Sequence, residues 1–385
     1  MMSLLASVPA NAGSAGVVAQ GEHFLHVFPS FGIGGVPLRM VRVINHLGAE
    51  LRHTVIALDN DIAAADSLAG DVRVTLRQFA RPSRGLVRST LDNVLALRRL
   101  RPDLLITYNW GAIEWAMANR LFPVSRQLHF EAGFGKEEAD TQLRRRVLFR
   151  RWALARCAKV VVPSRRLETL ARAVWKLSPG RVLYLPNGVD LERFAVNGLQ
   201  TSFVRRPGEL VIGTVAPLRP EKNVGRLLHA VAILGGSPRF RLVVAGEGAE
   251  RPALERLAGE LGLSDRVVFT GRVSPESVLG AFDVFALSSD TEQMPNALLE
   301  AMAASRAVAA VDVGDVRQMV CKDNREFIVP RDDAPALAAA IGRLLADPSM
   351  RAALGRKNRA RAVAEFSQQR MFSAYADVLA AGRAH

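Results

Sequence analysis

Short runs of consecutive apolar residues alternate along the chain with longer segments whose apolar residues recur at helical spacing. Four such runs lie in the first half of the chain and four in the second: residues 24–28, 54–58, 104–107, 160–162, 210–213, 241–245, 266–269 and 284–287. Strands that alternate with helices are typical of βαβ units around a parallel sheet. The pattern therefore predicts an α/β fold with two doubly wound, Rossmann-like domains in tandem.

The length of 385 residues, at about 150 residues per domain, also favours two domains. We expect a loose extension at 1–20, a first domain at 21–190, a linker of turn residues at 191–208 and a second domain at 209–365. The tail from Ala334 has a helical period that we expect to break only at Asp347–Pro348, and a last helix is expected at 366–385. Two such domains facing each other leave a cleft at the carboxyl ends of their strands, where ligands bind.

Targeting signals and cysteine content point to one compartment. No stretch reaches 18 consecutive apolar residues, and the first 20 residues lack the Lys or Arg of a secretory signal. The two cysteines, Cys157 and Cys321, fit a reducing environment and match no metal-ligand spacing. We therefore expect a cytoplasmic, globular protein.

Positive charge is concentrated in one segment. The chain has 51 Lys and Arg against 37 Asp and Glu, and residues 142–181 alone hold twelve basic side chains and one acid, Glu168. Such a segment is either a solvated face or a surface that binds an anionic membrane. No known nucleic-acid motif accompanies it, so nucleic acid is not an expected partner. The candidates for membrane contact are Arg144, Arg145, Arg146, Arg150 and Arg151.

The segment 288–303, directly after a predicted strand, carries the strongest candidate chemistry. Pro295 suits the first position of a helix, and the free N–H groups near Asn296 form a phosphate-binding site with the helix dipole. Glu300, about one and a half turns into that helix, has two carboxylate oxygens that can accept both hydroxyls of a ribose. Glu292, on the loop before the helix, can reach the group attached to the phosphates.

Two other loops that follow predicted strands suit a phosphorylated ligand. Arg219 and Lys222 can neutralise a departing diphosphate. Gly34 and Gly35 let the backbone approach a ligand closely, although residues 28–37 do not form the G-x-G-x-x-G dinucleotide motif.

Polar and aromatic residues at other strand ends are candidates for lining the cleft. They are Tyr108, Asn109, Trp110, His129 and Glu131. The triplet at residues 59–61 reads D-x-D, which we interpret as a turn that ends a strand, and no metal site is expected.

The segment from Glu292 to Glu300 resembles the E-x7-E motif of the retaining glycosyltransferases of family 4, and the resemblance covers nearly the whole chain. These enzymes have the GT-B fold, in which two Rossmann-like domains face each other across a cleft. The resemblance implies that Glu292 contacts the donor sugar and Glu300 binds the ribose. It also implies that the backbone at Met294, Pro295 and Asn296 holds the diphosphate.

Other positions carry the resemblance further. Lys222 matches a lysine that grips the diphosphate, Val273 lies in the loop that lines the base, and His129 lies near a pocket histidine that faces the reacting sugar. Gly34 and Gly35 match the loop beside donor and acceptor. Gln293 stands where the family often has Gly, and it could add a hydrogen bond of its own. Pro217 stands where the family has Arg, so either Arg219 or an Arg from the basic first domain is a candidate replacement.

The resemblance implies transfer of a sugar from a UDP- or GDP-sugar to a glycan or lipid acceptor, in cell-envelope or exopolysaccharide synthesis, with retention of configuration and no obligatory metal or cofactor. It also implies that the last helix returns to the first domain. Members that act on lipid-linked acceptors often bind membranes through that domain, which favours peripheral attachment to the inner membrane. Two other classes remain open: a nucleotide-sugar epimerase of the same fold, and a non-catalytic binder of membranes or nucleic acid.

Overall fold

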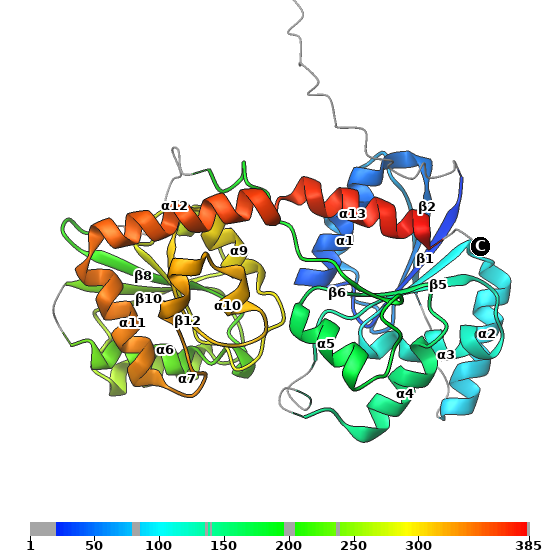
Figure 1. The fold of residues 1–385 in the computed structure, drawn as a ribbon, viewed down its shortest axis with the longest axis horizontal. Helices are drawn as coiled ribbons and strands as arrows, with labels where there is room; N and C mark the ends of the chain where they lie inside the picture. The colour runs from blue at the N-terminus through cyan, green and yellow to red at the C-terminus, as the bar shows by residue number, and fades with distance from the viewer. Residues whose placement is uncertain are drawn as a thin grey trace, which may run out of the picture.

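The computed structural model describes residues 21–78, 85–134, 138, 141–195, 205–235 and 239–382. They form two α/β domains that lie side by side along the long axis of the molecule (Figure 1). Both sheets are parallel throughout, which confirms the predicted fold class. The expected extension at 1–20 and residues 196–204 of the expected linker lie outside the described residues.

The first domain is built on a seven-stranded sheet in the order β3-β2-β1-β4-β5-β6-β7. Its strands are β1 (His23–Phe28), β2 (Arg52–Ala57), β3 (Arg73–Gln78), β4 (Leu104–Tyr108), β5 (Arg126–Phe130), β6 (Lys159–Val162) and β7 (Val182–Tyr184). Its helices are α1 (Gly35–Leu47), α2 (Leu86–Leu100), α3 (Ile113–Leu121), α4 (Arg144–Leu154) and α5 (Arg165–Ala173). The predicted runs match β1, β2, β4 and β6 but not β3, β5 or β7; β3 is an edge strand that leaves most of its side chains exposed.

The second domain is built on a six-stranded sheet in the order β10-β9-β8-β11-β12-β13. Its strands are β8 (Leu210–Val215), β9 (Phe240–Ala245), β10 (Val267–Gly271), β11 (Val284–Leu287), β12 (Ala307–Val311) and β13 (Ile328–Val329). Its helices are α6 (Val224–Ile233), α7 (Arg251–Glu260), α8 (Glu276–Leu279), α9 (Asn296–Ala303), α10 (Val316–Met319), α11 (Ala334–Ala346) and α12 (Pro348–Glu365). The strands of its centre are buried on both faces, as the continuous apolar runs predict.

The strand order brings the loops that carry the candidate site residues to the carboxyl-terminal edge of each sheet. In the first sheet β1 lies between β2 and β4, and in the second β8 lies between β9 and β11. Chain winding reverses beside β1 and β8, and a crevice opens at the carboxyl ends of the strands at such a point. The loops after β1, β8 and β11 therefore meet between the domains.

The carboxyl-terminal helices connect the domains a second time. Helix α12 packs on the second domain, and α13 (Gln368–Ala381) lies across the first (Figure 1). The helical tail breaks at Asp347, as expected, but also at Phe366–Ser367, so the expectation of a single break was wrong. Ser367 caps the new helix by accepting a hydrogen bond from the backbone N–H of Arg370, which favours a fresh start there.

One property of the helices bears on membranes. In the part of the chain that the structure describes, no helix is both long enough and apolar enough to span a bilayer.

Candidate active site

A cavity of about 580 Å³ lies between the domains, at the carboxyl ends of both sheets. We call it the donor cavity. Most of the predicted donor residues line it, together with residues of the first domain: Gly34, Gly35, Arg39, Asn187, Pro217, Arg219, Lys222, Glu247, Arg272, Ser289, Glu292, Met294, Pro295 and Asn296. Loops from both domains thus contribute to one concave site, which is the usual form of a small-molecule site.

Two helix N-termini face each other in this cavity. Helix α1 begins at Gly35 and α9 at Asn296, and a Cβ atom placed on Gly35 would lie 3.3 Å from the Asn296 side-chain nitrogen. Each N-terminus offers free backbone N–H groups and the positive end of a dipole. Pro295 was predicted as the first helical residue of α9 but is its N-cap, because its ψ of 122° is still extended and the helix begins at Asn296. The pair of N-termini favours binding of an anion.

An ion pair stands on the second-domain side of the donor cavity. Lys222 Nζ lies 2.6 Å from Glu292 Oε1, and Ser289 Oγ donates a hydrogen bond of 2.8 Å to the same oxygen. Lys222 ends a single 3-10 turn that begins with Arg219 as its N-cap. Because both side chains of the pair are partly exposed to the cavity, a phosphate or a sugar can compete for them.

Glu300 lies one turn deeper in α9 and is not among the residues that line the donor cavity. Burial raises the pKa of Glu300 to about 7, although the nearby Arg42 and Arg193 act to lower it. Arg42 belongs to α1 of the first domain, so the carboxyl group lies close to both domains. Its charge therefore depends on pH in the physiological range.

Sequence reasoning missed several residues that line the donor cavity, including two from the first domain. Arg39 and Asn187 belong to the first domain, and Arg39 Nη1 donates to Asn187 Oδ1. Asn187 Nδ2 donates to the carbonyl oxygen of Met294 and to Asn296 Oδ1, at 3.0 and 2.9 Å. In the loop that the resemblance places beside the base, Arg272 lines the cavity, while Val273 packs against the second-domain core. An Arg one turn after the paired glycines and an Asn-Gly turn were the available signals.

A second cavity of about 420 Å³, here called the acceptor cavity, opens on the first-domain side. Val36 and Ala132 line both cavities, so the two adjoin. The predicted residues Asn109 and Trp110 line the acceptor cavity, and so do Phe134, Glu138, Arg146 and Arg150. This places an aromatic, partly charged pocket beside the donor cavity.

Tyr108 does not line the cleft, contrary to expectation. Its side chain is buried, its hydroxyl lies 2.9 Å from His26 Nδ1, and its ring stacks on Phe28 with centroids 3.9 Å apart. Because side chains alternate along a strand, the last residue of β4 points into the core and Asn109 is the first to face the cleft.

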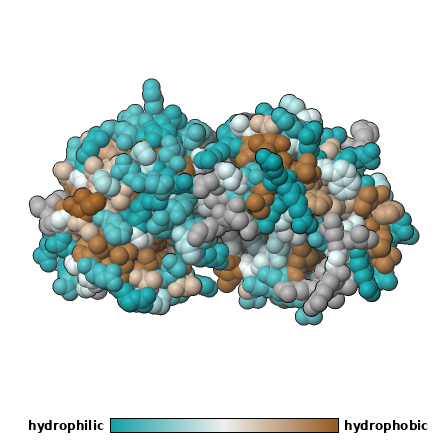
Figure 2. Space-filling model, turned by 90° about the horizontal axis from the view of Figure 1, so that it is seen from below, coloured by the Kyte–Doolittle hydropathy of each residue, from teal (hydrophilic) through white to brown (hydrophobic). Residues whose placement is uncertain are grey.

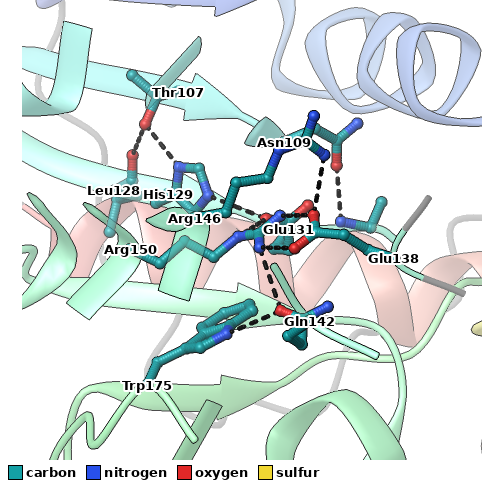
Figure 3. Close-up of polar contacts among 11 residues, drawn as sticks. Thr107, Asn109, Leu128, His129, Glu131, Glu138, Gln142, Arg146, Arg150 and Trp175 are labelled. Atoms are coloured by element: carbon teal, nitrogen blue, oxygen red, sulfur yellow. Dashed lines mark hydrogen bonds and ion pairs between the residues drawn. The ribbon is translucent and has the colours of Figure 1, made fainter. Parts of the chain in front are cut away.

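His129 and Glu131 are also buried in the first domain, and neither lines the donor or the acceptor cavity (Figure 3). His129 lies within β5 rather than after it, and its Nδ1 is 2.9 Å from Thr107 Oγ1. Its Nε2 lies 3.8 Å from Glu131 Oε2. The expected contact of His129 with a reacting sugar is therefore not seen, because the alternation of β5 turns the ring inward.

Arg150 is the centre of the same buried cluster (Figure 3). Its Nε donates to Glu131 at 3.2 Å, and its two terminal nitrogens donate to Glu138 at 3.0 Å each. Its guanidinium also lies about 5 Å from the rings of Trp110, Phe134 and Trp175. The prediction that Arg150 contacts a membrane was therefore wrong: this side chain is fully buried and paired.

The other arginines of α4 differ from Arg150. Arg146 is partly buried and donates to Glu138 at 3.1 Å, whereas Arg144, Arg145 and Arg151 are exposed. Burial alone would raise the pKa of Glu138, but the hydrogen bonds and charges of Arg150 and Arg146 outweigh it and hold that pKa below its ordinary value. Glu138 is therefore ionised at neutral pH.

The D-x-D triplet forms a turn. Asn60 adopts a left-handed conformation with φ of 63°, and Asp59 Oδ1 accepts from the backbone N–H of Asp61. Among the residues that the structure describes, no three His, Cys, Asp or Glu side chains are grouped so that they could hold a metal ion.

The fold and the site together define a two-domain protein with two helix N-termini and a lysine in its interdomain cleft. Family models match both halves of the chain: the model for glycosyl transferases group 1 matches residues 200–361, and that for glycosyltransferase family 4 matches residues 33–193. The chain belongs to the glycosyltransferases with the GT-B fold.

Curated relatives are also glycosyltransferases. The 2-deoxystreptamine N-acetyl-D-glucosaminyltransferase of Streptomyces fradiae is 30% identical over 290 residues, which is 68% of each chain. The 2-deoxystreptamine glucosyltransferase of Streptomyces kanamyceticus is 32% identical over 52% of this chain and 54% of its own length. A lipopolysaccharide core biosynthesis glycosyltransferase of Rhizobium meliloti, LpsE, is 33% identical over 41% of this chain and 46% of its own. The chain thus spans about half the length of several of the relatives that it matches.

Among solved structures, HepE of Anabaena in complex with UDP superimposes with a TM-score of 0.77 at 18% identity. The match covers 93% of this chain and 99% of HepE. At this identity the likeness supports the fold alone.

Proposed function

We propose that the protein is a retaining glycosyltransferase that uses a UDP- or GDP-sugar as donor. The observation that carries the proposal is the donor cavity itself, where two helix N-termini face each other beside Lys222 and Arg219. Two dipoles and two cations can stabilise the diphosphate as the glycosidic bond to phosphate breaks. Retention of configuration is proposed from the resemblance of the Glu292–Glu300 segment to retaining enzymes.

The proposed reaction is a substitution at the anomeric carbon in which the acceptor attacks on the face that the diphosphate leaves, so that the configuration is retained. A hydroxyl oxygen of the acceptor bonds to that carbon, the bond to the diphosphate oxygen breaks, and the hydroxyl proton passes to the departing phosphate. Lys222 would leave its ion pair with Glu292 and pair with the diphosphate instead. Glu292 would then be free to accept hydrogen bonds from the donor sugar. Ionised Glu300 would hold the ribose. HepE is described in complexes with UDP and with UDP-glucose, which supports a donor of this class.

The acceptor cavity supports a carbohydrate acceptor. Its walls include the rings of Trp110 and Phe134, which suit the apolar faces of a sugar, and it adjoins the donor cavity at Val36 and Ala132. Curated relatives transfer to an aminocyclitol or act in lipopolysaccharide core synthesis. We propose a glycan or lipid-linked glycan of the cell envelope or of an exopolysaccharide.

A basic and apolar surface supports peripheral binding to an anionic membrane. Helices α2, α3 and α4 lie in a row along the lower edge of the first domain (Figure 1). This surface, here called the α2–α4 face, exposes apolar and basic side chains together: Leu91, Leu95, Arg98, Arg99, Leu121, Phe122, Arg144, Arg145, Leu148, Arg151 and Trp152. Apolar and hydrophilic residues are intermixed on the right-hand half of Figure 2, which views the molecule from below. Exposed Leu and Trp can enter a headgroup layer while each Arg contributes about 1 kcal/mol near anionic lipid.

The donor is tested by thermal shift of the protein with a panel of nucleotide sugars, followed by product analysis with membrane lipid extract as acceptor. We expect one sugar to be transferred with its anomeric configuration retained, as read from NMR coupling constants, and activity to survive a chelator. Conversion of a UDP-sugar without any acceptor would instead indicate an epimerase. The absence of stabilisation by any nucleotide sugar or nucleotide would refute the proposal.

The membrane contact is tested by sedimentation with vesicles of phosphatidylglycerol or phosphatidylcholine. Wild type is expected to bind only the anionic vesicles, and binding should weaken as salt is raised. The variant Leu148→Ser/Trp152→Ser should lose most of this binding, as should Arg144→Glu/Arg145→Glu/Arg151→Glu. A matched control, Ile233→Ser/Val363→Ser, changes exposed apolar residues of the second domain and should bind as wild type does. Equal binding of all variants would refute the role of the α2–α4 face.

A further inference from the structure

The side chain of Gln293 leaves its own domain and crosses to the other. Gln293 follows Glu292 on the loop between β11 and α9, and its Oε1 accepts a hydrogen bond of 2.8 Å from Ser164 Oγ in the first domain. On the way it passes Gly133, where an added Cβ would lie 3.2 Å from Gln293 Cγ. A glycine at position 293, as the family often has, could make neither contact.

The hydroxyl group of Ser164 is buried and makes two hydrogen bonds, one of them to Gln293. Its side chain is fully buried, and its Oγ also accepts a hydrogen bond of 3.1 Å from the backbone N–H of Leu167, which caps helix α5. The hydroxyl thus uses its single proton for Gln293 and a lone pair for its own helix. The loop that carries Glu292 is therefore bonded to the start of a first-domain helix.

A second bond set joins the same two elements. The N–H groups of Arg165 and Arg166, at the start of α5, donate to the carboxylate of Asp315 in the second domain at 2.6 and 3.1 Å. The backbone N–H of Asp315 in turn donates to the carbonyl oxygen of Gln293 at 3.0 Å. The first N–H groups of α5 are thus satisfied partly by its own cap and partly by the other domain.

Close packing makes the two second-domain loops one unit. Gly314 has φ of 54°, and a Cβ there would collide with the carbonyl oxygens of Glu292 and Gln293. The backbone before Asp315 therefore lies directly against the backbone of Glu292. Any shift of Gln293 relative to α5 would be passed to its neighbour Glu292 through this rigid contact.

We propose that Gln293 is a positioning residue that couples the orientation of Glu292 to the first domain through its hydrogen bond to Ser164. The inference rests on the proposed function and deepens it, because it names what aligns the donor sugar with an acceptor held on the other domain. The groups proposed to hold the nucleotide are the N-termini of α1 and α9 and the Lys222 loop, and none of them takes part in the bond between Gln293 and Ser164. The bond to Ser164 instead fixes the sugar-facing loop relative to the acceptor cavity.

The test compares Gln293→Ala and Ser164→Gly with wild type, using the UDP-sugar and acceptor found in the screen above. Gly is nearly as good an N-cap as Ser, so Ser164→Gly removes the hydroxyl at little cost to α5. Loss of one hydrogen bond should lower kcat about three- to tenfold, with KM for the donor changed less than twofold. The control Gln369→Ala changes an exposed glutamine of α13 and should leave both constants unchanged.

The double variant decides whether the two residues act together. If they act through one bond, Gln293→Ala/Ser164→Gly should be no slower than the slower single variant. Effects on kcat that multiply, or a rise in donor KM with kcat unchanged, would overturn the coupling.

Measurements on the donor alone separate this inference from the function itself. Each variant should bind UDP with wild-type affinity by calorimetry and melt within a few degrees of wild type, since the donor loops are intact. Variants that lose UDP binding would overturn the positioning role. If wild type transfers no sugar from any donor, the proposed function fails first.

Discussion

At the scale of single residues, Lys222 has the role that is most open to test. It pairs with Glu292 at 2.6 Å in the donor cavity and is the family-matched cation of its loop. A diphosphate can pair with Lys222 only after the ion pair between Lys222 and Glu292 has opened. We therefore expect Lys222 to stabilise the transition state, in which negative charge develops on the leaving phosphate, more than it stabilises the bound donor.

We expect Lys222→Gln to lower kcat/KM by about ten- to a hundredfold, because a hydrogen bond to a charged group contributes about 1.5–3 kcal/mol. Steady-state kinetics with a UDP-sugar measures this. Lys357→Gln is a matched control, because Lys357 pairs with Asp323 on the surface of the second domain, away from the cavity. If Lys222→Gln and Lys357→Gln were equally active, the proposed role of Lys222 in catalysis would be wrong.

Glu300 provides a prediction on pH. Burial raises its pKa to about 7, so the carboxyl group is half protonated near neutrality. If its ionised form binds ribose, UDP affinity should fall as pH is lowered from 8 to 6, and Glu300→Gln should bind weakly at both values. Calorimetric titration with UDP measures the effect; a wild-type affinity that does not change over this range would contradict it.

The same shift has the opposite sign for stability. The folded state binds the Glu300 proton more tightly than the unfolded state does. The contribution of protonated Glu300 to the free energy of unfolding is therefore fully present below pH 4.5 and is lost as pH rises through about 7. As pH rises from 4.5 to about 7, the melting temperature of Glu300→Gln should therefore rise relative to that of wild type.

At the scale of elements, β1 and β2 hold a buried histidine pair. His26 Nε2 lies 3.0 Å from His53 Nδ1, and burial lowers the pKa of His26 well below its ordinary value and that of His53 to about 4. The unfolded chain binds protons here near pH 6.5 and the folded chain does not, so stability is lost as pH falls from 6.5 towards 4.

We expect the first domain to be the acid-sensitive one. Hydrogen exchange at pH 7.5 and 5 should show greater loss of protection in β1 and β2 than in β8 and β9. His53→Gln, which keeps a hydrogen-bonding side chain but cannot titrate, should reduce the difference between the two pH values. A uniform loss of protection across both sheets would argue against this assignment.

The elements also show what the sequence could predict. Apolar runs located eight of the thirteen strands that the structure describes, and strand ends located the donor loops, because a parallel sheet collects the ends of its strands at one edge. The pattern could not say which residue of a strand end turns inward, so Tyr108 and His129 were assigned to the cleft. It also could not pair Arg150 with Glu131 and Glu138, since such partners are chosen by the tertiary fold.

At the scale of the whole molecule, helix α13 completes the first domain from the far end of the chain. Met371, Phe372, Tyr375, Val378 and Leu379 are buried in the first-domain core, and Phe372 stacks on His46 of α1 with centroids 4.2 Å apart. Helix α13 is thus part of the first-domain core rather than a helix that packs only on the surface of the domain.

Phe372→Ala should destabilise the first domain by about 3–5 kcal/mol, the usual cost of removing a buried aromatic ring. Denaturant unfolding followed by hydrogen exchange should show the loss in β1, β4 and α1, with β8 to β12 protected as before. Leu148→Ala, which changes an exposed side chain of the same domain, provides the control. Equal losses in both variants would contradict the packing role.

The two chain crossings between the domains run side by side. Val189 and Ser367 form a parallel bridge: the N–H of Val189 donates to Phe366 O at 2.8 Å, and the N–H of Gln368 donates to Val189 O at 2.9 Å. The first domain is not one continuous piece of the chain, because α13 belongs to its core, so a fragment that stops at residue 190 lacks one helix of that core. A cut at either crossing alone leaves the halves joined by the other. Dissecting this protein into working halves therefore calls for a circular permutant that joins residue 382 to residue 21, rather than for a simple truncation.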